Sequence, residues 1–150
     1  MLHGKQLPQN GAESMRLLGI DYGDARVGIA LSDPFGWTAA PLPCLSGKNK
    51  KELLRQIDRL VREHGVEKIV LGFPKNMNGT VGPRGEMSRQ LAEQLRELTG
   101  LEVVLWDERL TTVSAAQIMN QTNVRGQKRK QQIDSLSAVL ILENYLQTLS

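Results

Sequence analysis

The spacing of hydrophobic residues divides the chain into strand-like and helix-like segments. Two short apolar runs, 16–23 and 27–33, are separated by a turn-forming segment, and this arrangement predicts a β-hairpin. A third strand is expected near 38–45, although two prolines within it cannot donate hydrogen bonds to a sheet. The segment 49–64 then carries leucine, isoleucine and valine at helical spacing, and Gly65 follows as a stop signal.

The second half of the chain alternates buried-strand and helix patterns. These patterns occur in turn at 67–73, 86–99, 101–106, 111–120 and about 131–148. The helix expected at 86–99 has an apolar stripe of Met87, Leu91, Leu95 and Leu98. Strands joined by helical crossovers pair in parallel. The predicted order is therefore βββαβαβαα, an α/β fold with a mixed five-stranded sheet flanked by helices.

Composition narrows the class of protein. The 150 residues suit one domain, with 40% hydrophobic and 23% charged residues, a globular balance. We expect the polar residues 1–14 to form a flexible extension of a domain at 15–150. The single Cys44 excludes an internal disulfide framework and fits a cytoplasmic protein. No apolar run approaches the ~20 residues of a membrane-spanning helix, so no membrane contact is expected.

Basic residues are concentrated in the segment 120–130. This segment contains no acidic residue and four basic ones: Arg125, Lys128, Arg129 and Lys130. A concentrated basic loop favours a polyanionic partner such as nucleic acid. A solvated loop is an equally good interpretation of so short a run.

Further basic residues stand beside turn-forming segments. The glycine-rich segment 74–85 contains Lys75 and Arg84 and leads into a predicted helix, so its backbone amides could hold an anion. A flexible surface loop is the alternative. Arg26 and Arg109 are candidates either for phosphate contacts or for salt bridges with nearby acids.

Acidic residues interrupt apolar segments at two strand ends. Asp21 shares a strand face with Gly19 and is either a functional acid or the opening residue of a turn. Glu108 follows a buried strand, at the end where ligands bind in open α/β sheets. Alternatively, Glu108 is an acid that precedes the following helix, or it forms a salt bridge with Arg109. Asp107 is an alternative candidate for any functional role given to Glu108.

A third acid lies in the last predicted helix. Asp134 is aligned with Ala138, Ile141 and Tyr145 at helical spacing, which directs it towards the sheet. An aspartate that is simply stabilised in the first turn by the helix dipole is the alternative.

The three acids together predict a metal site. Carboxylates from two strand ends and a helix would repel one another unless a cation lay between them. Oxygen ligands suit Mg²⁺ or Mn²⁺ rather than zinc. Two such ions about 4 Å apart can activate a water and stabilise the leaving oxygen in phosphodiester hydrolysis. The pattern indicates a metal-dependent nuclease with Asp21, Glu108 and Asp134 as ligands and catalytic residues.

Four blocks of the sequence resemble the YqgF family. They are GIDYGDARVGIALSD, GFPKNMNGTVGPRGE, WDERLTT and K-x-x-x-D-S-L-S-A-V-L-I-L-E-N-Y-L, in the family's order across residues 17–146. The resemblance implies an RNase H-like fold and a metal-dependent nuclease of the cytoplasm, with its acids at Asp21, Glu108 and Asp134. Members are described both as Holliday-junction resolvases and as nucleases that mature the 5′ end of the small-subunit ribosomal RNA precursor. Asn78 stands where the family often has aspartate, so we leave it out of the acid set.

Three functions remain open from the sequence. The first is a nuclease, for which the resemblance favours precursor ribosomal RNA over branched DNA; resolving a junction needs a dimer, and we expect a monomer or a homodimer. The second is an ATP-binding module, since a strand followed by Asp-x-Gly also opens actin-like kinases, although these need two such domains. The third is a non-catalytic nucleic-acid-binding module, whose binding would depend on salt and give no product.

Overall fold

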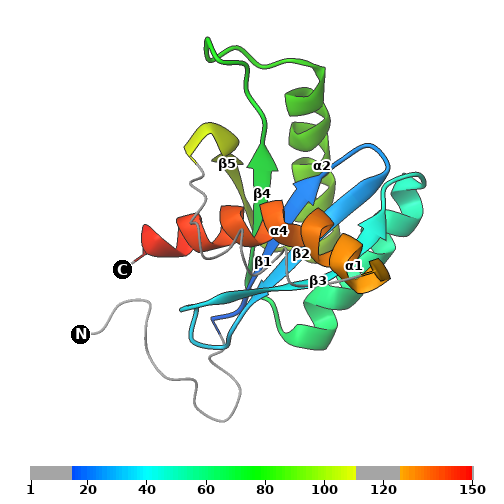
Figure 1. Ribbon diagram of the computed structural model, residues 1–150, viewed down its shortest axis with the longest axis vertical. Coiled ribbons are helices and arrows are strands. Elements are labelled where there is room, and N and C mark those ends of the chain that lie inside the picture. The colour runs from blue at the N-terminus through cyan, green and yellow to red at the C-terminus, as the bar shows by residue number, and fades with distance from the viewer. Residues whose placement is uncertain (1–14, 111–125, 150) are drawn as a thin grey trace.

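The computed structural model describes residues 15–110 and 126–149, with the backbone alone at 126–134 (Figure 1). The elements are, in chain order, β1 (Leu17–Tyr22), β2 (Arg26–Ser32), β3 (Ala39–Ser46), α1 (Lys50–His64), β4 (Lys68–Phe73), α2 (Pro83–Thr99), β5 (Glu102–Asp107), the short 3-10 helix η1 (Glu108–Leu110) and α4 (Gly126–Gln147). The expected extension 1–14 and the expected helix 111–120 lie outside the described residues.

The five strands form one mixed sheet in the order β3-β2-β1-β4-β5. β2 is antiparallel to both β1 and β3, whereas β1, β4 and β5 run parallel. The predicted hairpin and the mixed five-stranded sheet are confirmed. Proline is tolerated at positions 41 and 43 because β3 is an edge strand, whose outer side has no partner in the sheet.

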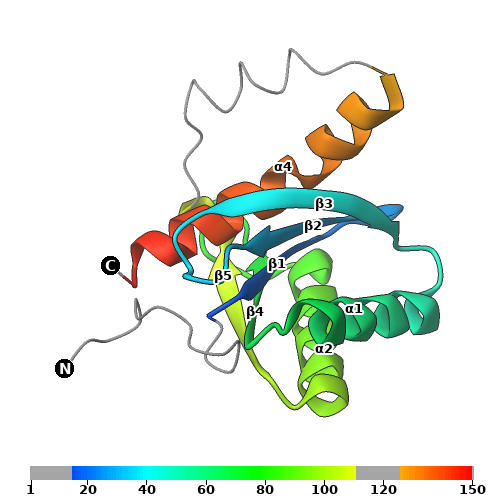
Figure 2. The same cartoon turned by 90° about the horizontal axis from the view of Figure 1, so that it is seen from below.

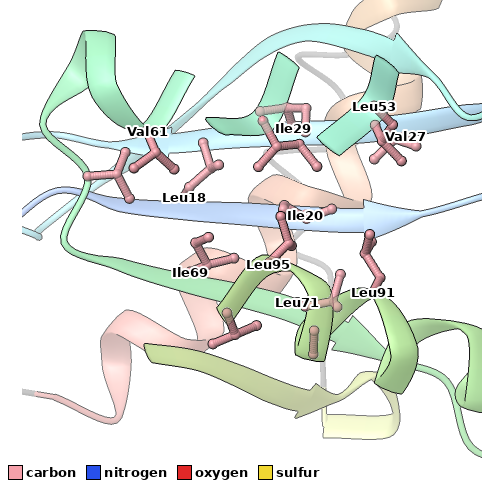
Figure 3. Packing of buried hydrophobic residues seen from close by; sticks show 14 residues of the cluster. Leu18, Ile20, Val27, Ile29, Leu53, Val61, Ile69, Leu71, Leu91 and Leu95 are labelled. Carbon is pink, nitrogen blue, oxygen red and sulfur yellow. The ribbon is translucent and has the colours of Figure 1, made fainter. Parts of the chain in front are cut away.

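Helices cover both faces of the sheet. α1 and α2 lie against one face and α4 crosses the other, as two perpendicular views show (Figure 1, Figure 2). On the first face, alternate strand residues such as Leu18, Ile20 and Leu71 pack against Leu53 and Leu91 of the helices (Figure 3). Each of these side chains is fully buried, and such burial stabilises the fold by about 1.5–3 kcal/mol per side chain.

Two small residues fix α4 against the opposite face. Gly19 of β1 has no side chain, and a Cβ there would lie 2.9 Å from the Cβ of Leu142 and 3.0 Å from the carbonyl oxygen of Ala138. The buried hydroxyl of Ser135 donates to the carbonyl oxygen of Leu42 at 2.7 Å and accepts from the amide of Ile29 at 3.2 Å. α4 therefore contacts the centre of the sheet through backbone and side chains together.

Three sequence expectations need correction. The second helix begins at Pro83 rather than at residue 86, because proline is well suited to the first position of a helix. Its expected apolar stripe is half wrong: Met87 is 40% and Leu98 is 44% exposed. α4 begins at Gly126 rather than at 131, so the basic residues at 128–130 belong to a helix and not to a loop. In the described ranges, no helix is long and apolar enough to cross a membrane.

Candidate active site

Asp21 lies at the carboxyl end of β1, on the sheet face that α4 covers. It alternates with Ile20, which points to the other face, as the strand period predicted. The hydroxyl of Ser137 on α4 donates a hydrogen bond to its carboxylate. Burial raises the pKa of Asp21, and this rise is opposed by the positive charge of Arg84 and by the Ser137 hydrogen bond.

Glu108 lies beside Asp21, across a gap in the sheet surface. Since Ile20 pairs with Leu71, the next positions along the parallel register are Asp21 and Gly72. A Cβ at Gly72 would lie 2.7 Å from Oε2 of Glu108, so the Glu108 carboxylate occupies the space that a side chain would fill. The absence of a side chain at position 72 therefore brings the two acids together.

The proximity of the two acids is also evident in their electrostatics. Burial raises the pKa of Glu108 to about 7, and the negative charge of Asp21 contributes to this rise. Arg84 opposes the rise through its positive charge. A carboxyl group with a pKa near 7 is half protonated at pH 7. A cation placed beside it would strongly stabilise its charged form.

Asp107 has a different environment from its neighbour Glu108. Its carboxylate accepts two guanidinium hydrogen bonds from Arg109, at 3.1 Å from Nε and 2.8 Å from Nη2, and Lys75 Nζ lies 4.0 Å away. The hydrogen bond from the Arg109 side chain is the main cause that lowers the pKa of Asp107. Asp107 is thus already neutralised by cations of the protein, whereas Glu108 is paired with another acid.

The third predicted acid, Asp134, is in α4, but its side chain lies outside the described part of the chain. Among the described residues, no group of three or more His, Cys, Asp and Glu side chains could hold a metal ion. Of the predicted acids, the structure therefore brings together Asp21 and Glu108.

Two features of this site were missed in the sequence. Gly72 is a glycine inside an apolar strand, which is a recognised sign of close approach by another group. Ser137 was missed because its hydrogen bond to Asp21 joins residues that are far apart in the chain. A helix residue three positions after a candidate acid shares its face, and this spacing could have identified Ser137.

Four of the predicted basic residues lie at the same edge of the sheet, where β1, β4 and β5 end and β2 begins. Lys75 follows β4, Arg109 follows β5, and Arg26 opens β2 with an exposed side chain. Arg84 lies in the first turn of α2 and pairs with Asp24 at 3.1 Å. The side chains of 128–130 and the whole of Arg125 lie outside the described residues.

The glycine-rich segment after β4 has an internal structure of its own. Asn78 Oδ1 accepts hydrogen bonds from the amide of Thr80 at 3.1 Å and from its hydroxyl at 2.7 Å. Asn76 Nδ2 donates to the same hydroxyl at 2.8 Å. Asn78 therefore stabilises a turn in this segment. An aspartate, which the family often has at this position, could accept the same two hydrogen bonds.

A methyl group at Gly72 tests how Glu108 is positioned. We expect Gly72→Ala to force apart the Glu108 carboxylate and Ile141 Cδ1, each of which would lie 2.7 Å from the new Cβ. Both atoms are the far ends of side chains that can shift, although Ile141 is buried, so the cost should be at the low end for overpacking, about 1 kcal/mol. This corresponds to a Tm loss of about 2–4 °C in a domain of this size. In the control Gly82→Ala, the nearest atoms lie at 3.8 Å and Tm should change little. If Gly72→Ala had the same Tm as the wild type, the Glu108 carboxylate would not occupy the space beside Gly72.

Solved structures show which fold the protein has. RuvC of T. thermophilus in complex with Holliday junction substrate matches with a TM-score of 0.58 at 10% identity, covering 89% of this chain and 96% of that one. The fowlpox virus Holliday junction resolvase matches with a TM-score of 0.51 at 15% identity, covering 90% and 100%. At these identities the likeness establishes the fold alone, and the fold is RNase H-like.

Sequence comparison identifies the family within this class. Residues 15–148 match the family model described as "RuvX: Holliday junction resolvase". Proteins of Bacillus cytotoxicus and Ruminiclostridium cellulolyticum, both named "Putative pre-16S rRNA nuclease", are each 48% identical over 134 residues. The matches cover 88% of this chain and 98% and 94% of the two relatives. The chain belongs to the RuvX (YqgF) family of nucleases, which confirms the resemblance seen in the sequence.

Proposed function

We propose that this protein is a divalent-metal-dependent nuclease that processes the 5′ end of precursor small-subunit (pre-16S) ribosomal RNA. The observation that carries the proposal is the pair of half-buried acids, Asp21 and Glu108, held beside each other over Gly72. Burial raises the pKa of both groups. Two neighbouring carboxylates in such a place destabilise the protein unless a cation neutralises them.

The donor atoms fit Mg²⁺ or Mn²⁺. Carboxylate oxygens are the ligands that these ions prefer, and neither thiolate nor imidazole is needed. We propose Asp134 as the third ligand, because helix spacing puts it on the same face of α4 as Ala138, which packs against β1. When bound, such a cation lowers the pKa of a coordinated water and stabilises charge on the leaving oxygen.

The protein's own side chains would perform the remaining tasks. Asp21, Glu108 and Asp134 hold the cation, and Ser137 orients the Asp21 carboxylate through its hydrogen bond. Basic side chains position the phosphate backbone, which fixes the register of a nucleic acid without reading its bases. We assign this role to Arg26, Lys75, Arg84, Arg109, Arg125, Lys128, Arg129 and Lys130.

The choice of substrate follows the relatives, whose names refer to pre-16S ribosomal RNA. We propose that the protein acts on this RNA in the cytoplasm. We propose a monomer or a homodimer as the active form.

Resolution of four-way DNA junctions is the second candidate function. The family description and the fold shared with RuvC favour it. This activity requires two active sites in one complex, because two strands must be cut. A homodimer in sedimentation would support it, and a monomer would exclude a pair of linked sites.

A cleavage assay decides between the candidates. The protein is incubated with Mg²⁺, Mn²⁺ or EDTA on an RNA that spans the precursor 5′ junction and on a synthetic four-way DNA junction. We expect metal-dependent products from the RNA and none in EDTA. Products from the DNA junction alone would replace the first candidate by the second. Salt-sensitive binding without product on either substrate would indicate a non-catalytic binding module.

A further inference from the structure

Arg84 stands between two acidic groups. Its Nη1 atom donates to Asp24 Oδ2 at 3.1 Å. Its positive charge also opposes the rise in the pKa values of Asp21 and Glu108, so the guanidinium group is within electrostatic reach of the acidic pair. Since Arg84 begins α2 and Asp24 lies in the β1–β2 turn, the ion pair joins two elements that border the candidate active site.

The turn that carries Asp24 has a fixed backbone. The amide of Gly23 donates to the carbonyl oxygen of Arg26 at 3.1 Å, and the amide of Gly47 donates to that of Ala25 at 2.9 Å. A Cβ at Gly47 would lie 2.9 Å from the carbonyl oxygen of Gly23 and 3.0 Å from that of Asp24. The turn is therefore packed closely against the segment after β3 and presents Asp24 at a defined place.

The ion pair itself is easily exchanged. The side chain of Arg84 is 58% exposed and that of Asp24 is 74% exposed. Solvent-exposed ion pairs contribute little to stability, because both charges are well solvated when they are apart. A phosphodiester offers arginine two oxygens in the fork geometry that its guanidinium group matches, and such charge-assisted pairs are strong. A phosphate close to the acidic pair can thus displace Asp24 from Arg84.

We propose that Arg84 exchanges partners, from Asp24 in the free protein to a backbone phosphate of the bound nucleic acid, with Asp24 as the competing, positioning residue. The inference rests on the proposed nuclease function. It adds that Asp24 lowers the affinity for the substrate by competing for Arg84. Arg84 contacts the substrate, whereas Asp24 acts only through Arg84. Removing Asp24 therefore strengthens binding, and it does so only while Arg84 is present.

A double-mutant cycle tests this dependence. Binding of a fluorescent RNA spanning the precursor 5′ junction is measured in EDTA for the wild type, Asp24→Asn, Arg84→Gln and the double variant. We expect Arg84→Gln to weaken binding about tenfold and Asp24→Asn to tighten it about two- to fivefold. The double variant should bind like Arg84→Gln alone. Additive effects would overturn the proposal, because Asp24 would then act as a general negative charge.

A second ion pair supplies the matched control. Arg59 and Glu63 pair at 2.8 Å on α1, with side chains 77% and 50% exposed. Helix α1 lies on the sheet face opposite to α4 (Figure 2). Glu63→Gln and Arg59→Gln make the same charge changes and should leave RNA affinity within about twofold of wild type. Asp24→Glu should restore wild-type affinity, since it retains the competing carboxylate.

The outcomes separate this inference from the proposed function. If the wild type binds neither the RNA nor a four-way DNA junction, the nuclease proposal fails and this inference fails with it. If the wild type binds and cleaves but the two substitutions are additive, only the exchange of partners is wrong. If Asp24→Asn tightens binding to the DNA junction only when Arg84 is present, and has no such effect on the RNA, the exchange takes place on branched DNA. In that case the assignment of RNA as the substrate is wrong.

Discussion

Asp21→Asn should abolish cleavage while the protein stays folded. The amide keeps the size of the side chain but loses the negative charge that a divalent cation requires, and metal assistance contributes several kcal/mol to such reactions. We therefore expect activity at least about a thousandfold below that of the wild type on whichever substrate is cut. Cleavage is measured at saturating Mn²⁺ with the same RNA and DNA junction as above.

Stability provides the control for Asp21→Asn. Because burial raises the folded-state pKa of Asp21 above 3.8, the charged form disfavours folding. The stability that this group contributes is present at low pH and is lost as pH rises through the raised pKa. At pH 8 the uncharged variant should therefore melt at the wild-type temperature or above it. The control Asp58→Asn, on α1, should remain fully active. An active Asp21→Asn variant would remove Asp21 from the site.

Glu108→Gln should be as damaging as Asp21→Asn, and Asp107→Asn should not. Glu108 faces the other buried acid, whereas Asp107 is bound by Arg109 and Lys75. We expect a loss of about a thousandfold for Glu108→Gln and of less than about tenfold for Asp107→Asn, whose pairing with Arg109 is partly exposed. The reverse order of effects would assign Asp107 as the ligand.

The pH dependence of metal binding gives Glu108 a second readout. Its pKa of about 7 means that it is mostly protonated at pH 6 and mostly charged at pH 8. A cation must displace that proton, so apparent affinity should fall about tenfold per pH unit below 7. The rise in Tm caused by Mn²⁺ should therefore be small at pH 6 and larger at pH 8. Glu108→Gln should remove this dependence. An equal Mn²⁺ effect at both pH values in the wild type would count against Glu108 as a ligand.

The local sequence pattern was sufficient to predict those elements that are defined by interactions between residues close together in the chain. The period of two in β1 put Asp21 on the opposite face from Ile20, and the buried runs of β4 and β5 identified parallel strands. Helix α1 was predicted to within one residue, because its apolar residues recur at helical spacing and Gly65, at φ 63°, ends it; Asn49, predicted as its first residue, is its N-cap. These features depend on backbone geometry and on burial of one face, both of which act over a few residues.

The extents of α2 and α4 required the tertiary structure. Leu98 fits a helical stripe in the sequence, yet it is 44% exposed because the sheet contacts Leu91 and Leu95 instead. The start of α4 at Gly126 was missed because its first turns carry no apolar pattern. Periodicity reports which residues can share a face, but the position of the sheet decides which of them are buried.

Within the described residues, the sequence by itself determined the order of the five strands and of α1, α2 and α4, the family, and two acids at strand ends. Only the tertiary structure decided that Glu108 rather than Asp107 faces Asp21, and that Gly72 provides the space where they meet. It also decided that Arg84 pairs with Asp24, 60 residues away in the chain. These contacts join residues on different elements, and their electrostatic energies depend on distance and burial in the folded protein, which no local pattern encodes.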